Sequence, residues 1–158
     1  MRALQFAVLL IGLLVLQTTV APHLAFLGVT PDLVLVAVII LAVLGQKEQA
    51  VLFAAAAALG QDLLGQGGYL ATILKVAFTA VIANFRDELG GDEYNLAAGL
   101  VALVTPFYLL LELGALFFFH GREISPNFVL LKLTAGTVYN LLLVPILYPL
   151  LRRLADVD

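Results

Sequence analysis

The sequence predicts an all-α membrane protein, a bundle of six transmembrane helices with short loops and both termini in the cytoplasm. Composition supports this fold class. Hydrophobic residues make up 63% of the 158 residues, charged residues only 12%, and the mean hydropathy is +1.08. Soluble domains carry about 25% charged residues. A spanning helix needs about 20 apolar residues, so the chain has room for about six spans and no separate soluble domain. Residues 1–158 are therefore expected to form a single integral membrane domain.

The expected spans follow from the apolar runs and the residues that interrupt them. Pro22 ends the first run, and because it directly follows Ala21, where cleavage would fall, we interpret this run as a retained span and not a signal peptide. Thr30 and Pro31 supply an N-cap and a first-turn proline for the second helix, and Asp32 suits the positive end of its dipole. The predicted helices cover approximately residues 3–21, 31–44, 49–64, 69–85, 96–119 and 127–151.

The orientation follows from the positions of the basic residues. With six spans both termini lie on one side of the membrane, and that side collects most of the lysines and arginines at helix ends. Arg122 stands alone on the other side, against Arg2, Lys47, Arg86, Arg152 and Arg153. Because cytoplasmic loops are enriched in Lys and Arg, both termini are predicted to be cytoplasmic. A five-span alternative would weaken this asymmetry by separating the two ends of the chain.

Four ionisable residues fall within the predicted spans, all in the outer half of the membrane: Asp62, Lys75, Glu112 and Lys132. Such residues are rare in lipid and usually face the interior of a bundle. Glu112 and Lys132 each lie about ten residues from the centre of the loop that joins the last two spans, so they should meet at similar depth. Helical spacing places Lys132 on one face with Gly136, Tyr139 and Asn140, and Glu112 on one face with Thr105 and Tyr108.

Asp62 and Lys75 flank a glycine-rich outer turn that contains Gly65, Gly67 and Gly68. Their distances from the centre of this turn differ by about five residues, or roughly 7 Å along a helix. A lysine side chain covers most of that distance, although it also tends to snorkel toward the interface. Two interpretations remain open for both pairs. They lock helices together, or they form a polar site for a ligand or partner on the outer side.

The sequence contains no pattern typical of an enzyme. It has no cysteine, only one serine, and no HExxH, GxSxG or phosphate-binding glycine loop. We expect no catalytic residues, no cofactor and no metal site. The net charge of −3 and the absence of a basic run argue against nucleic acid as a partner.

Two stretches resemble a known family. TPDLVLVAVIILAVLGQ, followed by an alanine-rich span that ends in GQDLLGQGGYLATILK, is similar to the rod shape-determining protein MreD. The resemblance covers essentially the whole chain, and its sharpest part is Gly60, Asp62, Leu63 and Gly68. It implies a non-enzymatic, multi-pass component of the bacterial inner membrane that acts in cell elongation and lateral peptidoglycan synthesis.

The resemblance also implies partners. The family associates with MreC, a membrane-anchored periplasmic protein, and works with RodA, the elongation transpeptidase and MreB filaments. Its architecture is similar to that of the substrate-binding subunits of energy-coupling-factor vitamin transporters. The alternative function is therefore a membrane subunit that binds a small molecule for transport.

Overall fold

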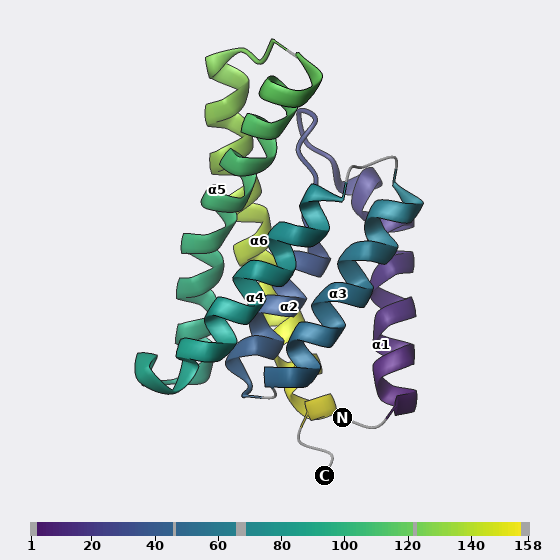
Figure 1. Cartoon of the computed structure of the whole chain (residues 1–158), viewed down its shortest axis with the longest axis vertical. Coiled ribbons are helices and arrows are strands. Elements are labelled where there is room, and N and C mark those ends of the chain that lie inside the picture. Colours follow the sequence, from purple (N-terminus) through teal and green to yellow (C-terminus); the bar gives the residue numbers. More distant parts are fainter. Residues whose placement is uncertain (1–2, 46, 66–68, 122, 156–158) are drawn as a thin grey trace.

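The computed structural model describes residues 3–45, 47–65, 69–121 and 123–155, and these form an antiparallel arrangement of α-helices (Figure 1). The described residues contain no β-strand. The start of α1 and the end of α6 lie at the same end of the molecule. The helices are α1 (Ala3–Val15), continued by the π-helical η1 (Leu16–Val20) and the 3₁₀ turn η2 (Ala21–Leu24), then α2 (Leu33–Val43), α3 (Lys47–Leu64), α4 (Leu70–Leu89), α5 (Glu93–His120) and α6 (Pro126–Ala155).

The predicted all-α class is confirmed for the described residues, and the membrane character is supported by the length and composition of part of them. Three helical segments of the described residues are long and apolar enough to cross a bilayer: Ala3–Leu24, Glu93–Phe119 and Pro126–Ala155. The helix α2 is apolar but only 11 residues long. The helices α3 and α4 have 18 and 20 residues and carry several charged side chains. A count of six spans therefore remains a prediction.

Several helix boundaries differ from those expected. The polar segment 86–95 was predicted to be a loop, yet α4 continues to Leu89 and α5 begins at Glu93. The turn is short because Gly90 adopts a positive φ of 55° and Asp92 caps α5 by accepting a hydrogen bond from the Asn95 backbone N–H at 3.0 Å. Pro22 does not end the first helical segment, because it lies in the first turn of η2, where its missing N–H is not needed.

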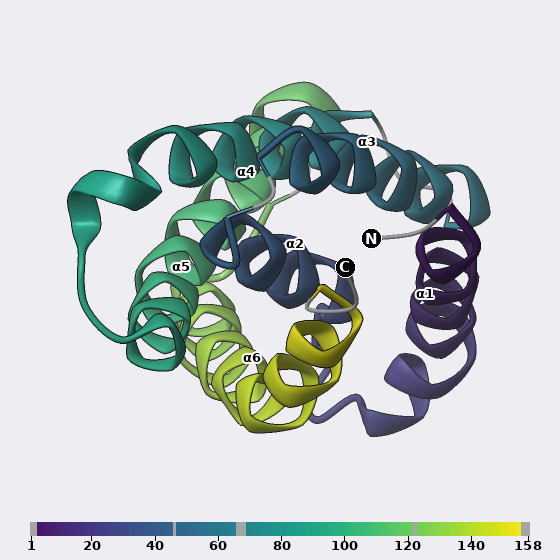
Figure 2. The same cartoon turned by 90° about the horizontal axis from the view of Figure 1, so that it is seen from below.

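The helix α2 lies at the centre of the bundle, and the other helices surround it (Figure 2). Every residue from Val34 to Val43 is buried, and all ten are Val, Leu, Ile or Ala. At 1.5 Å per residue α2 is only about 16 Å long, which is shorter than the roughly 30 Å hydrocarbon core. This length is tolerable because α2 packs against protein on all sides. The non-helical segment that precedes it must likewise be shielded from lipid if it lies at membrane depth.

Small residues lie where neighbouring helices pack together. Ala54 and Ala57 of α3 are fully buried. A Cβ atom placed on Gly60 would lie 2.7 Å from Leu14 Cδ1 of α1, and one placed on Gly136 of α6 would lie 2.7 Å from Leu109 Cδ1 of α5. Both glycines therefore sit at close helix crossings, which is how helices associate in the absence of a hydrophobic driving force.

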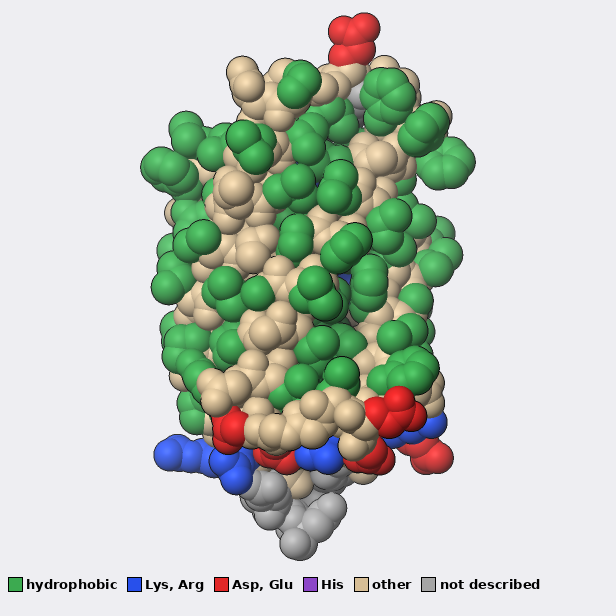
Figure 3. Space-filling model, turned by 90° about the vertical axis from the view of Figure 1, so that its left-hand side faces the viewer, with side chains coloured by type: hydrophobic (Ala, Val, Ile, Leu, Met, Phe, Trp, Pro, Cys, Tyr) green, Lys and Arg blue, Asp and Glu red, His purple; other side chains and the backbone are tan. Residues whose placement is uncertain are grey.

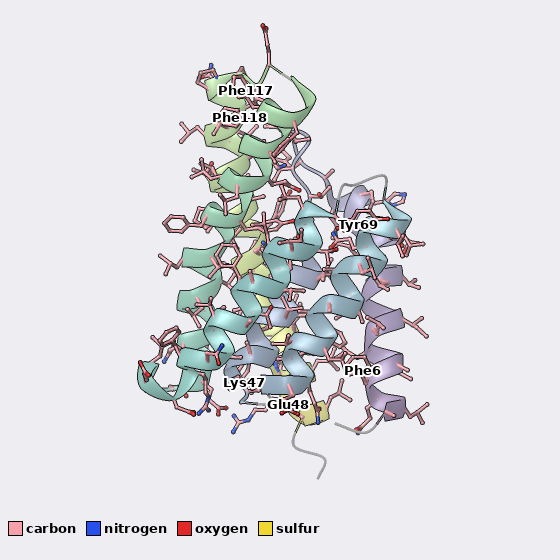
Figure 4. The ribbon with its side chains drawn as sticks, in the orientation of Figure 1. Phe6, Lys47, Glu48, Tyr69, Phe117 and Phe118 are labelled. Atoms are coloured by element: carbon pink, nitrogen blue, oxygen red, sulfur yellow. The ribbon has the colours of Figure 1, made fainter. Side chains whose placement is uncertain are left out.

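The lateral surface is apolar, whereas charged side chains gather in a band at one end (Figure 3). Lys47 and Glu48 belong to this end, and Phe117 and Phe118 lie at the opposite one (Figure 4). There the hairpin of α5 and α6 extends beyond the other helices (Figure 1). The hairpin extends further because α5 and α6 have 28 and 30 residues, whereas α3 has 18.

The close contact at Gly60 predicts a position-specific effect on stability. Gly60→Val should lower the free energy of unfolding by about 1–3 kcal/mol, because the added side chain overpacks the crossing of α1 and α3. Gly99→Val is the matched control, since nothing lies within 4 Å of a Cβ at this helical position. Unfolding in mixed detergent micelles measures both. Equal effects at the two glycines would contradict the close packing.

A polar cavity at the N-terminal end of α2

A cavity of about 450 Å³ lies at the end of the bundle where α2 begins, opposite the charged band. Its wall combines residues of η1, the segment 28–32, α3, α4, α5 and α6. Gly28, Gly65 and Phe119 in this wall are exposed, whereas Asp62 and Tyr108 are buried, so the cavity is accessible from outside but has a buried floor. The polar side chains that line it are Gln17, Thr30, Asp32, Gln61, Asp62, Tyr108, Glu112 and Lys132.

Lys75 forms the most deeply buried ion pair in the described residues. Its Nζ lies 2.8 Å from Asp32 Oδ2, and the side chains are 0% and 16% exposed. Lys75 Nζ also donates a hydrogen bond to Gln61 Oε1 and lies 5.3 Å from the centre of the Tyr108 ring. The lysine was expected to snorkel outward or to pair with Asp62. Both expectations are wrong, because Asp32, at the start of the central helix, offers a carboxylate within the bundle.

The amino end of α2 is held by side chains from several helices. Asp32 Oδ1 accepts a hydrogen bond from the Leu35 N–H at 2.9 Å, so Asp32, and not Thr30 as predicted, is the N-cap. Gln17 accepts a hydrogen bond from the Leu33 N–H at 2.7 Å and donates one to the Pro31 carbonyl at 3.1 Å. These bonds satisfy backbone groups that a buried helix end would otherwise leave unpaired.

The predicted interior residue Asn140 completes this arrangement. Its Oδ1 accepts a hydrogen bond from the Asp32 N–H at 2.9 Å, and its Nδ2 donates to Thr105 Oγ1 at 3.3 Å. Asn140 is 2% exposed and Thr105 fully buried. The polar stripes of α5 and α6 therefore face the bundle interior, as their helical spacing predicted, and connect both helices to α2.

The helix α4 contacts both ends of α2 through its two basic residues. Lys75 pairs with Asp32 at the first end, and Arg86 donates a hydrogen bond from Nε to the Val43 carbonyl at 2.7 Å at the second. Asp32 and Val43 are eleven positions apart, and so are Lys75 and Arg86. Because α2 and α4 run in the same direction, each interval spans about 16 Å and the two contacts form in register.

Asp62 has a different role from the expected pairing with Lys75. Its Oδ2 accepts hydrogen bonds from the Thr72 backbone N–H at 3.0 Å and from Thr72 Oγ1 at 2.6 Å. Asp62 on α3 thus binds the first turn of α4, where the positive end of the helix dipole favours an anion. Asp62 is only 8% exposed, yet no described cation forms an ion pair with it.

Glu112 and Lys132 meet, as their equal distances from the connecting loop predicted. Lys132 Nζ donates to Glu112 Oε2 at 2.8 Å, and both residues line the cavity. The side chains are 20% and 33% exposed, so this pair is less buried than that of Lys75. The cavity therefore holds one well-shielded ion pair near its floor and one that is more accessible.

Two further predicted residues, Tyr139 and Leu63, lie outside the cavity wall. Tyr139 is half-buried on α6 and makes no hydrogen bond with another described side chain. Leu63 is 68% exposed on the outer surface of α3. Gly67 and Gly68, expected in the outer turn, lie outside the described residues.

Sequence reasoning did not anticipate that Asp32, Gln17, Gln61 and Thr72 belong to this site. For Asp32 a signal was present, since it is the only charged residue in the predicted second helix and begins it at the depth of the other outer charges. For the two glutamines and Thr72 the sequence offers no comparable signal. Which neighbours they contact depends on the packing of η1, α3 and α4.

Comparisons of the chain with protein-family models, with curated proteins and with solved structures found no match.

Removing one partner of the ion pair between Asp32 and Lys75 should strongly destabilise the protein. Lys75→Met leaves a carboxylate without its partner and should lower the free energy of unfolding by about 3–5 kcal/mol. Asp32→Asn keeps an N-cap residue but leaves the ammonium group of Lys75 without its carboxylate partner. The double variant should recover much of the loss, because no unpaired charge remains. Losses that simply add in this double-mutant cycle, measured by detergent unfolding, would refute the coupling.

The more exposed pair should matter less. Lys132→Met and Glu112→Gln should each destabilise the protein by less than Lys75→Met, because solvent reaches part of both side chains. The same unfolding assay measures all three variants. A greater loss of unfolding free energy for Lys132→Met than for Lys75→Met would show that burial does not determine which pair matters more.

Proposed function

We propose that the chain is a non-enzymatic, multi-pass component of the bacterial inner membrane that acts as a partner and scaffold for MreC in the cell-elongation machinery. The resemblance of its sequence to MreD motivates this proposal. The observation that carries it is the role of the motif residues: Gly60 packs α3 against α1, and Asp62 ties α3 to the start of α4. Residues that join helices in this way suit an assembly component.

The outer tip of the α5–α6 hairpin is the surface that suits a periplasmic partner. Phe118 and Phe119 are both 81% exposed, and Phe117 is 52% exposed. The tip extends beyond the ends of α3 and α4 (Figures 1 and 4). Exposed aromatic side chains that protrude from a bundle are typical of protein interaction sites. In the proposed complex MreC packs its membrane span and the adjoining segment against this side, within reach of Tyr69.

The opposite end is less suited to MreC but offers contacts for cytoplasmic partners such as MreB. Arg86 pairs with Glu93 at 2.8 Å, and Tyr148 donates a hydrogen bond to the second carboxylate oxygen of Glu93 at 3.3 Å. Asp87 and Glu88 remain exposed beside this cluster. RodA and the elongation transpeptidase are further partners in this proposal.

The cavity favours a second candidate function, a membrane subunit that binds a small molecule for transport. Its volume of about 450 Å³ falls within the range of roughly 300–1,000 Å³ usual for small-molecule sites. Saturable binding of a vitamin-type molecule by the purified protein, together with its uptake by cells, would favour this function. Stable copurification with MreC and rounding of cells on depletion would favour the scaffold.

Copurification tests the proposed interface. Phe118→Ala and Tyr69→Ala should each reduce the MreC recovered with the tagged protein from native membranes by about tenfold or more, because aromatic residues dominate interface energies. Phe107→Ala is the matched control, since Phe107 is also exposed on α5 but lies away from the tip. Glu88→Gln probes the opposite end. Loss of MreC confined to Glu88→Gln would count against the proposed interface.

A further inference from the structure

The wall of the cavity and the residues behind it contain one more acidic group than basic groups. Three carboxylates belong to it, those of Asp32, Asp62 and Glu112. Two ammonium groups face them, and each is already bound at 2.8 Å, Lys75 to Asp32 and Lys132 to Glu112. Asp62 is left without a cation among the described residues. A buried carboxylate without a counter-charge is costly, so a ligand that brings a positive charge gains the most from this site.

The hydrogen bonds of Asp62 leave room for such a ligand. Both bonds from Thr72 end on Oδ2, and Oδ1 accepts none from the described residues. The start of α4 stabilises the ionised carboxylate through its dipole and its N–H group. Asp62 therefore lies in the wall of an accessible cavity, and no described residue donates a hydrogen bond to its Oδ1.

Tyr108 supplies a second, independent indication of a ligand. Its side chain lines the cavity, it is only 2% exposed, and its hydroxyl forms no hydrogen bond with another described residue. The hydroxyl itself is open to the cavity, so a ligand bound there can supply the partner that tyrosine hydroxyls usually find inside proteins. This hydroxyl both donates and accepts, so it can bind an ammonium hydrogen or an oxygen of the ligand.

The mouth of the cavity differs from its floor. Phe119 is exposed and Leu116 half-buried in the wall formed by α5, whereas the floor is polar. Lys132 also lines the wall, but Glu112 already balances its charge, so the site favours a ligand without excess negative charge. The cavity volume of about 450 Å³ is within the range usual for small-molecule sites and is adequate for a zwitterionic headgroup.

We propose that this cavity binds a primary ammonium group, that of an aminophospholipid headgroup or of a free zwitterion with the same chemistry, and that Asp62 and Tyr108 recognise it. Asp62 accepts a charge-assisted hydrogen bond from the ammonium, and Tyr108 contributes a neutral one. The inference concerns the ligand of the cavity alone, and it holds whether the protein is a scaffold or a transporter subunit.

Lipid retention in nanodiscs tests this proposal. The intact protein is reconstituted with phosphatidylethanolamine, phosphatidylglycerol or phosphatidylcholine, and bound lipid is counted by native mass spectrometry. Phosphatidylethanolamine should be retained at least tenfold better than phosphatidylglycerol, which has no ammonium. Phosphatidylcholine should also be retained poorly, because its trimethylammonium group donates no hydrogen bond. Equal retention of the three lipids would overturn the proposal.

Variants identify the residues. Asp62→Asn removes the charge and should reduce retention of phosphatidylethanolamine about tenfold or more, whereas Tyr108→Phe should cause a severalfold loss. Glu123→Gln, an equal charge change at an exposed outer position, and Tyr139→Phe, outside the cavity, should bind like the unaltered protein. If Asp62→Asn fails to fold, Ala115→Phe decides instead, since it fills the cavity without changing its charge. Wild-type retention by Tyr108→Phe and Ala115→Phe would overturn the assignment.

A second experiment, with a soluble headgroup compound, distinguishes a lipid ligand from a free zwitterion. Glycerophosphoethanolamine, whose phosphodiester carries the same single negative charge as the lipid headgroup, is titrated calorimetrically into protein held in phosphatidylglycerol nanodiscs. Saturable binding that Asp62→Asn weakens supports a free zwitterion, and retention of phosphatidylethanolamine without such binding supports a lipid. The absence of both overturns the proposal. Neither experiment contains MreC, so the result is independent of the proposed scaffold.

Discussion

The buried ion pair between Lys75 and Asp32 determines how the central helix is held. The helix α2 contains only aliphatic side chains between Val34 and Val43, so no polar side chain fixes its axial position along this part. Its polar contacts lie at its ends, where Lys75 binds Asp32 and Arg86 binds the Val43 carbonyl. Because an axial shift of α2 would separate buried Lys75 from Asp32 and also break the bond of Arg86 to Val43, the two contacts together disfavour such a shift.

The cavity is a consequence of this central helix being short. The outer helices α5 and α6 are more than twice as long as the 11 residues of α2, so the bundle has no core helix along its outer part. The segment 25–32 occupies part of that space and satisfies its backbone through Gln17 and Asn140. Polar side chains therefore gather beyond the N-terminal end of α2. The space between the long helices that these side chains leave unfilled is the cavity.

The helical fold class and the ion pair of Glu112 and Lys132 could be predicted from the sequence. Both follow from hydropathy and from distances along the chain within one helical hairpin. Hydropathy predicts helices, and equal distances from a hairpin loop place Glu112 opposite Lys132. The partner of Lys75 could not be derived in this way. Asp32 is 43 positions away in sequence, and its approach depends on α2 packing beside α4. Asp62 is near Lys75 in sequence, yet the turn presents it to Thr72 at the start of α4.

The two aspartates of the cavity, Asp32 and Asp62, differ in whether a cation of the chain balances their charge. This difference distinguishes a charge that holds helices together from one that a ligand can bind. Asp32 meets a lysine that is fully withdrawn from solvent, and each charge compensates the other within the chain. Asp62 receives only dipolar compensation, from two hydrogen bonds of Thr72 and from the start of α4. Such compensation stabilises an anion without neutralising it. Of the three carboxylates of the cavity, Asp62 is therefore the one whose negative charge is not balanced by a described ion pair, and so the one that a cationic ligand can still complement.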